Sequence, residues 1–106
     1  MTDFIQITTT TSNRSDADRI AYTLVERRLA ACVQVIGPIT STYRWQGHVE
    51  TAEEWSCIIK TSQAQLDVIR QVFRELHPYE VPELIATPIV AGGEAYLKWL
   101  GEQLSG

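Results

Sequence analysis

The stretch that decides the fold runs from residue 31 to residue 61 and reads ACVQVIGPITSTYRWQGHVETAEEWSCIIKT. It contains two arms rich in β-branched and aromatic residues, which favour strands, on either side of Trp45-Gln46-Gly47-His48. Gly47 stands at the second loop position, where it can adopt the positive φ of a two-residue hairpin turn. The sequence therefore predicts a β-hairpin with its tip at Gln46 and Gly47, and leaves the turn type open.

The length of this hairpin carries a second prediction. The arm from His48 to Thr61 contains neither Pro nor Gly, and fully extended it would span about 45 Å, whereas a compact domain of this size is about 35 Å across. A projecting two-stranded ribbon is marginal alone in water, and its edges are open to pairing. We therefore expect other copies of the chain to cover it in an obligate homo-oligomer. The alternative is an arm that breaks near Ala52-Glu53-Glu54, which are poor strand formers, and folds back.

Size, charge and cysteine content restrict the class of protein. A chain of 106 residues forms one domain, residues 1–106. Its net charge of −4 argues against nucleic acid as the main partner, since phosphate binding requires a basic patch. No apolar run has the length of a membrane span and no signal-peptide pattern begins the chain, so we expect a cytoplasmic protein. Cys32 and Cys57 lack CxxC spacing and are expected to be reduced, small buried side chains.

The N-terminal part predicts a strand over residues 4–10 and then a helix. Ser12 and Asn13 are candidate N-caps, and Asp16 suits the positive end of the helix dipole. Arg27 and Arg28 are expected in the last turn of that helix, where cations are favoured. Gly37-Pro38 interrupts the first hairpin arm and predicts a bulge.

After the hairpin, Ser62 and Gln65 have the spacing of a capping box. The second helix is predicted from a helical-period apolar stripe, namely Leu66, Ile69, Val72, Phe73 and Leu76. His77-Pro78 ends this helix, because the residue before proline is forced out of the helical region. A rigid connector over residues 77–83, an edge strand over residues 84–90 and a terminal helix over residues 95–104 follow. The order is that of a ferredoxin-like βαββαβ sandwich with a long central hairpin and a C-terminal helix, an α+β fold.

Residues with metal or catalytic chemistry are few. No CxxC, HxxxH or HExxH motif is present, so no tightly bound cofactor is expected, although a symmetric assembly could build a site from one residue per subunit. His77 is the leading candidate, since it follows a helix C-terminus that favours its protonated form and stands beside Tyr79, Glu80 and Glu83. It is either a surface helix stop or a group facing a metal ion or an anion in a cleft. His48 is predicted to be a solvated turn residue.

Five segments resemble those of the CutA family, the divalent-cation tolerance proteins, in order and spacing. They are Leu29-Ala-Ala-Cys-Val33, Ser41-Thr-Tyr-Arg-Trp-Gln-Gly47, Ile59-Lys-Thr61, His77-Pro-Tyr-Glu-Val-Pro-Glu83 and Tyr96-Leu-Lys-Trp99. The resemblance implies a homotrimer built around the long hairpins, a cytoplasmic location and a role in tolerance to copper and other divalent cations. It also implies an architecture similar to that of the PII signalling proteins, whose inter-subunit clefts bind small effectors.

Residue by residue, His77 matches the family histidine that is implicated in metal binding. Five further residues match positions that look like the lining of an inter-subunit cleft, namely Tyr43, Trp45, Lys60, Tyr79 and Glu80. Where some members carry a cysteine and a second histidine, this chain has Thr9 and Leu76.

Four functional hypotheses follow. The first is a trimeric protein of divalent-cation (copper) tolerance and homeostasis, without catalytic activity, that binds copper or another divalent cation weakly at inter-subunit sites. The second is a PII-like signalling protein with a small-molecule effector in the cleft. An enzyme that uses Glu80 or Glu83 with His77 as an acid–base cluster ranks last, and a structural scaffold is the simplest alternative.

Overall fold

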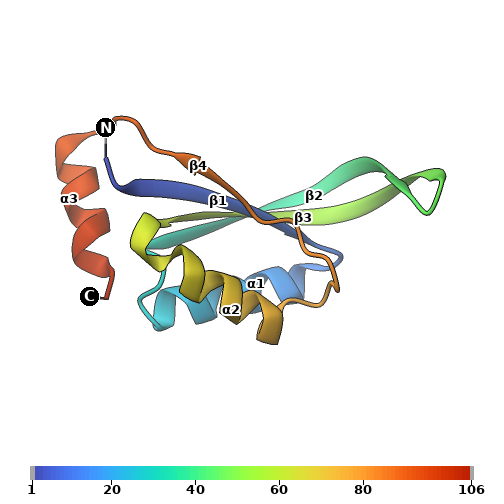
Figure 1. Cartoon of the computed structure of the whole chain (residues 1–106), viewed down its shortest axis with the longest axis horizontal. Coiled ribbons are helices and arrows are strands. Elements are labelled where there is room, and N and C mark those ends of the chain that lie inside the picture. Colours follow the sequence, from blue (N-terminus) through green and yellow to red (C-terminus); the bar gives the residue numbers. More distant parts are fainter. Residues whose placement is uncertain (1, 106) are drawn as a thin grey trace.

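The computed structural model describes residues 2–105. Its elements in chain order are β1 (Phe4–Thr11), α1 (Arg14–Glu26), β2 (Cys32–Trp45), β3 (His48–Ser62), the 3₁₀ turn η1 (Gln63–Gln65), α2 (Leu66–Leu76), β4 (Ile85–Pro88) and α3 (Glu94–Gln103). The strands form one antiparallel sheet in the order β2-β3-β1-β4. Helices α1 and α2 lie on the same face of this sheet, and α3 lies at its end near the N-terminus (Figure 1). The predicted α+β, ferredoxin-like architecture is confirmed.

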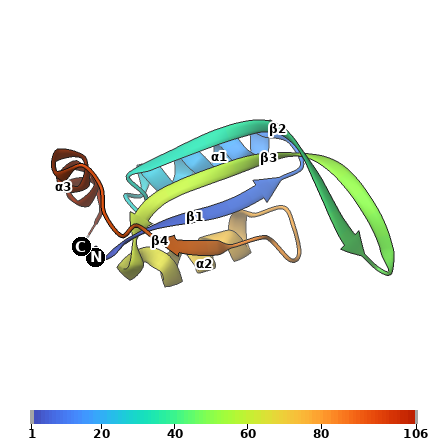
Figure 2. The ribbon, with the colours of Figure 1, turned by 90° about the horizontal axis from the view of Figure 1, so that it is seen from above.

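The central hairpin is extended along its whole length. Its ladder runs from Cys32 opposite Lys60 to Trp45 opposite His48, and it includes Glu53 opposite Thr40. The predicted alternative of a break near Ala52-Glu53-Glu54 is therefore wrong, because paired backbone groups outweigh the weak strand propensity of these residues. The hairpin projects from the body of the molecule (Figure 2). The whole chain, with the hairpin included, has extents of 45 × 26 × 22 Å.

The turn and the bulge of the hairpin lie where the sequence places them. Gln46 and Gly47 both have positive φ, 50° and 83°, which defines a type I′ turn. The register shifts between Ile36 and Ile39, at the cis Gly37-Pro38 peptide. The indole of Trp55 packs directly over Gly37, since a Cβ at this glycine would approach Trp55 Cδ1 to 2.4 Å.

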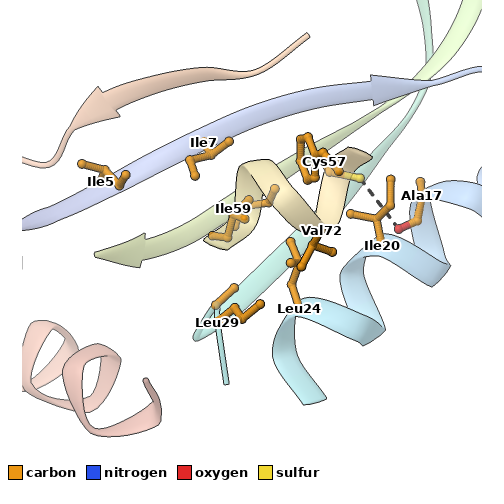
Figure 3. Close-up of a cluster of buried hydrophobic side chains, with 12 residues drawn as sticks. Ile5, Ile7, Ala17, Ile20, Leu24, Leu29, Cys57, Ile59 and Val72 are labelled. Atoms are coloured by element: carbon orange, nitrogen blue, oxygen red, sulfur yellow. Dashed lines mark hydrogen bonds between the residues drawn. The ribbon is translucent and has the colours of Figure 1, made fainter. Parts of the chain in front are cut away.

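The core lies between the sheet and the two helices (Figure 3). It is formed by residues that alternate along β1 and β3 together with one side of each helix, namely Ile5, Ile7, Cys57, Ile59, Ala17, Ile20, Leu24, Ile69, Val72 and Phe73. Cys57 is fully buried and its thiol donates to the Ala17 carbonyl at 3.8 Å. Burial raises the pKa of this thiol to about 11, and both cysteines are free thiols. The prediction of a small buried side chain is confirmed for Cys57, whereas Cys32, on the edge strand β2, is only half-buried.

Two predicted helix ends are corrected. Asn13 caps α1 by accepting from the Asp16 amide, as expected, but α1 stops at Glu26, so Arg27 and Arg28 lie beyond its last turn. Ser62 makes no side-chain capping bond. The side-chain amide of Gln65 (Nε2) donates instead to the backbone carbonyl of Ser105 at 2.7 Å, because the C-terminal segment lies within reach of this side chain.

Arg28 adopts φ 61°, the left-handed conformation that follows many helices and favours glycine. Its guanidinium donates to the carbonyls of Gln103 (2.9 Å) and Glu102 (2.7 Å). The end of α3 is thereby held against the end of α1.

Two variants at Arg28 separate the effect of backbone strain from the effect of the guanidinium hydrogen bonds to α3. Arg28→Ala is expected to be about 1 kcal/mol less stable than Arg28→Gly, since only glycine adopts this conformation without strain. Both variants lose the guanidinium bonds, so amides of α3 are expected to exchange faster with solvent in each. Chemical denaturation and hydrogen exchange measure the two effects, and equal stability of the variants would contradict the strain.

Candidate functional site: an acidic cleft beside the hairpin

A cleft of about 790 Å³ separates the outer half of the hairpin from the connector that follows α2. Its lining comes from the end of β1, from both hairpin arms and from the connector, namely Thr10, Ser41, Thr42, Tyr43, Trp45, Glu50, Glu54, Pro78, Tyr79, Glu80, Val81 and Glu83. The volume lies in the range of small-ligand sites. Four predicted cleft residues therefore come together here, Tyr43 and Trp45 from β2 with Tyr79 and Glu80 from the connector. Ligand binding by them stays a prediction.

Glu54 forms the buried part of this cleft, with 9% of its surface exposed. The Tyr79 hydroxyl donates to its Oε2 at 2.7 Å. Burial alone would raise the pKa of Glu54, but hydrogen bonds from Ser41, Tyr79 and Thr10 outweigh it and the pKa is lowered. Burial, and then the neighbouring carboxylate, raise the pKa of Tyr79. The pair is therefore a carboxylate bound to a neutral phenol, which fastens the connector to the hairpin.

Sequence reasoning did not select Glu54 as a functional residue. Within a strand of otherwise β-favouring residues, Glu53 and Glu54 indicated only weak strand propensity. The sequence did contain a signal for its position, since the hairpin register places Glu54 opposite Ile39 in the sheet. Its partner Tyr79 lies 25 residues along the chain, and only the folded connector brings that hydroxyl to it.

His77 lies behind the cleft and is not among the residues that line it. Its exposed fraction is 8%. Its Nδ1 accepts from the Tyr79 amide at 3.1 Å, so in the neutral ring Nε2 carries the proton and donates to Thr9 Oγ1 at 3.0 Å. The ring also packs between those of Phe73 and Tyr79, with centroids 5.5 and 5.2 Å away.

The electrostatics of His77 differ from the expectation for a histidine at a helix end. Burial lowers the pKa of its imidazole, against smaller raising contributions from the Thr10 backbone, Asp16 and Glu54. The expected stabilisation of the protonated form is corrected, because the ring is buried instead of facing solvent. Both ring nitrogens are used inside the chain, so the predicted metal ligation requires one of these bonds to break.

Lys60, the fifth predicted cleft residue, lies at the other end of β3. Its ammonium donates to Gln34 Oε1 at 3.2 Å and lies 5.9 Å from the centroid of the Tyr96 ring. One chain therefore does not join Lys60 to the other four residues, and its entry from a second copy stays a prediction. Across residues 2–105, no three His, Cys, Asp or Glu side chains are grouped closely enough to hold a metal ion.

The fold and the cleft define a small α+β protein of the ferredoxin-like class, with a projecting hairpin and an acidic cleft beside it. The chain belongs to the CutA1 divalent ion tolerance family, whose model, described as "CutA1 divalent ion tolerance protein", matches residues 5–103. This confirms the family resemblance read from the sequence.

Relatives and solved structures agree with this assignment. The chain is 45% identical over 86 residues to the "Divalent-cation tolerance protein CutA" of Thermus thermophilus, covering 81% of this chain and 84% of that one. It is 46% identical over 93 residues to a "Protein CutA homolog" of Xenopus laevis, covering 88% of this chain and 62% of that one. A Thermus thermophilus structure of Cut A1 superposes with a TM-score of 0.93 at 39% identity, over 96% of this chain and 99% of the other. CutA of Xylella fastidiosa gives 0.94 at 36% identity, over 98% and 100%.

The names of the relatives limit what transfers to this chain. They refer to divalent-cation tolerance and do not point to a known enzyme family. The chain spans about half the length of the Arabidopsis, mouse and human relatives. Relatives are named chloroplastic in Arabidopsis thaliana and periplasmic in Archaeoglobus fulgidus, so the location of this chain stays a prediction. No helix within residues 2–105 has both the length and the apolar character needed to cross a membrane.

Proposed function

We propose that this protein is a cytoplasmic homotrimer of divalent-cation tolerance that binds copper or another divalent cation weakly at sites completed between subunits. The observation that carries the proposal is the charge of the cleft. Four of its lining residues are glutamates, Glu50, Glu54, Glu80 and Glu83, and none of the described residues lining it is Lys, Arg or His. Carboxylates are ligands for divalent cations, and the family assignment supports the same class of ligand.

Weak binding is supported by the small number of ligands that one chain can offer. Since no group of three ligating side chains occurs within residues 2–105, a cation held by one chain keeps most of its water ligands. A second copy can add carboxylates or, for Cu(II), an imidazole. His77 can bind a cation only if its ring gives up its hydrogen bond with Thr9 or with the Tyr79 amide. Breaking that bond lowers the affinity of His77 for the cation.

Assembly is supported by apolar surface that one chain leaves open. On the hairpin, Tyr43, Trp45 and Val49 are 41%, 51% and 66% exposed. The sheet face opposite α1 and α2 carries Ile36 and Ile58, and neither of these helices covers it (Figure 1). Exposed apolar surface of this kind marks protein–protein contacts, and the edges of the hairpin are suited to pairing with another chain.

Calorimetric titration with Cu(II) and Zn(II), together with sedimentation of the metal-free protein, tests the proposal. A trimer is expected, and the double variant Glu80→Gln/Glu83→Gln is expected to lose at least about tenfold in affinity by removing two charged ligands. Glu102→Gln on α3 is the matched control and should bind like the wild type. His77→Ala measures the imidazole separately, and unchanged binding there would rule out His77 as a ligand.

A monodisperse monomer at micromolar concentration would overturn the inter-subunit part of the proposal. Wild-type affinity in the double variant would overturn the carboxylate part. The PII-like alternative is not favoured, since the family and its relatives are named for cation tolerance. Binding of a nucleotide or another effector to the cleft would restore it.

A further inference from the structure

A second concave surface lies on the other side of the connector. This groove, of about 550 Å³, runs between α2 and residues 79–84 and is lined by Arg70, Phe73, Arg74, Tyr79, Glu80, Val81, Pro82 and Leu84. Connector residues 79–81 separate it from the acidic cleft, since they line both. Its chemistry is different, because its floor is apolar and its cations come from one side of α2.

Two arginines stand one helical turn apart along this groove. Arg70 is paired with Asp67 at 2.8 Å, but that carboxylate is 86% exposed, and exposed pairs of this kind are weak. Arg74 forms no ion pair with any residue from 2 to 105. Glu80 is the one acid that lines the groove. The lining therefore carries two guanidinium groups and one carboxylate, in a chain of net charge −4.

The opposite wall of the groove is formed by the connector and is apolar. Val81 is 74% exposed although it lines a concave surface, so its side chain is available to a ligand. Pro82 restricts the backbone beside it, and Phe73 of α2, which also lines the groove, is only 3% exposed. A wall that is already ordered costs little entropy when a ligand binds.

We propose that this groove binds a small organic anion that has an apolar body, such as an aromatic or branched carboxylate. The carboxylate pairs with the guanidinium of Arg74, which can donate two parallel hydrogen bonds, and Arg70 adds a second cation. The apolar body covers Val81, Pro82 and Leu84. Both parts are needed, because a surface arginine alone holds an anion weakly and a groove this open buries little area.

Three probes separate these contributions in the full chain. 3-Phenylpropionate carries both features, 3-phenylpropanamide is its neutral isostere, and acetate is the anion without the ring. Amide chemical shifts followed during each titration are expected to move at residues 70–84 with 3-phenylpropionate. The other two probes are expected to bind at least about tenfold more weakly, since the amide lacks the charge-assisted hydrogen bond and acetate lacks the apolar body. Inorganic phosphate is expected to bind no better than acetate.

Variants assign the contact to the groove. Arg74→Gln is expected to weaken 3-phenylpropionate binding about tenfold, and Val81→Ser by a smaller factor of about three. Arg14→Gln on α1 is the matched control, since Arg14 makes only an exposed ion pair with Asp18 at 3.6 Å. Equal affinity for acid and amide, no effect of Arg74→Gln, shift changes confined to residues 41–54, or no binding at millimolar probe would each overturn the proposal. Glu80 and Val81 line both surfaces, whereas Arg74 lines only the groove and Glu83 only the cleft. Arg74→Gln should therefore leave the metal titration unchanged, so failure of one proposal can be told from failure of the other.

Discussion

Replacing Ile59 by alanine is expected to lower the free energy of unfolding by about 2–5 kcal/mol. Ile59 is fully buried on the central strand β3, where it lies opposite Ile7 of β1 and Val33 of β2. Both helices close over this side of the sheet, so the lost methyl groups leave a cavity that the surroundings cannot fill. Denaturation with urea, followed by circular dichroism, measures the loss.

The neighbouring residue is its matched control. Ile58 is one position away and therefore points to the opposite face of the sheet, where it is only partly buried in a single chain. Ile58→Ala is expected to act through association, so its effect should decrease as the protein is diluted below the concentration of assembly. The effect of Ile59→Ala should not depend on protein concentration in this way. Equal and concentration-independent losses in both variants would contradict the assignment of the two faces.

Replacing His77 by alanine is expected to cost about 2–4 kcal/mol, because the Thr9 hydroxyl and the Tyr79 amide each lose a buried partner. His77→Asn keeps an oxygen close to the position of Nδ1 and is expected to recover part of the loss by accepting from the Tyr79 amide. Thermal unfolding at pH 7.5 compares the three proteins. A cost below about 0.5 kcal/mol for the alanine variant would show that the ring is not a structural link.

The same residue gives stability a defined dependence on acid. Since the pKa of His77 is lowered in the folded state, the unfolded chain binds its proton first as the pH falls below the ordinary histidine value of about 6.5. This contribution to stability is complete above that pH and is lost as the pH falls through the folded pKa. Protonation also places an N–H at Nδ1 against the Tyr79 amide. His77→Asn should lack this part of the slope, and an unchanged slope would contradict it.

Glu54 acts in the same direction at lower pH. Its pKa is also lowered, so its contribution to stability is present above the ordinary glutamate value of about 4.5 and is lost below it. Glu54→Gln is the variant that separates this step from that of His77. The two steps begin at different pH, near 6.5 for His77 and near 4.5 for Glu54. Unfolding curves of His77→Asn and Glu54→Gln assign each part of the slope to its residue.

The order of the elements was predictable because it depends on local patterns. The β-branched arms around Gln46-Gly47, the apolar stripe from Leu66 to Leu76 and the proline after His77 each act over a few residues. The length of the β3 arm also indicated a projecting ribbon, since the rise per residue in a strand is nearly constant. Alternation along β1 and β3 determined which side chains could share a face, and hence which could form the core.

Only the tertiary structure decided where polar side chains find their partners. The sequence showed a Ser62–Gln65 capping box, but Gln65 donates to Ser105, and Arg28 bonds to carbonyls of α3. The inward turn of His77, the Tyr79–Glu54 bond and the groove beside Arg74 likewise depend on how the connector folds over α2 and the hairpin. The Tyr79–Glu54 bond joins residues 25 positions apart, and the Arg28–Gln103 bond joins residues 75 positions apart. Patterns within a few residues determine elements and their faces, whereas such distant pairings form only when the packed core has brought the segments together.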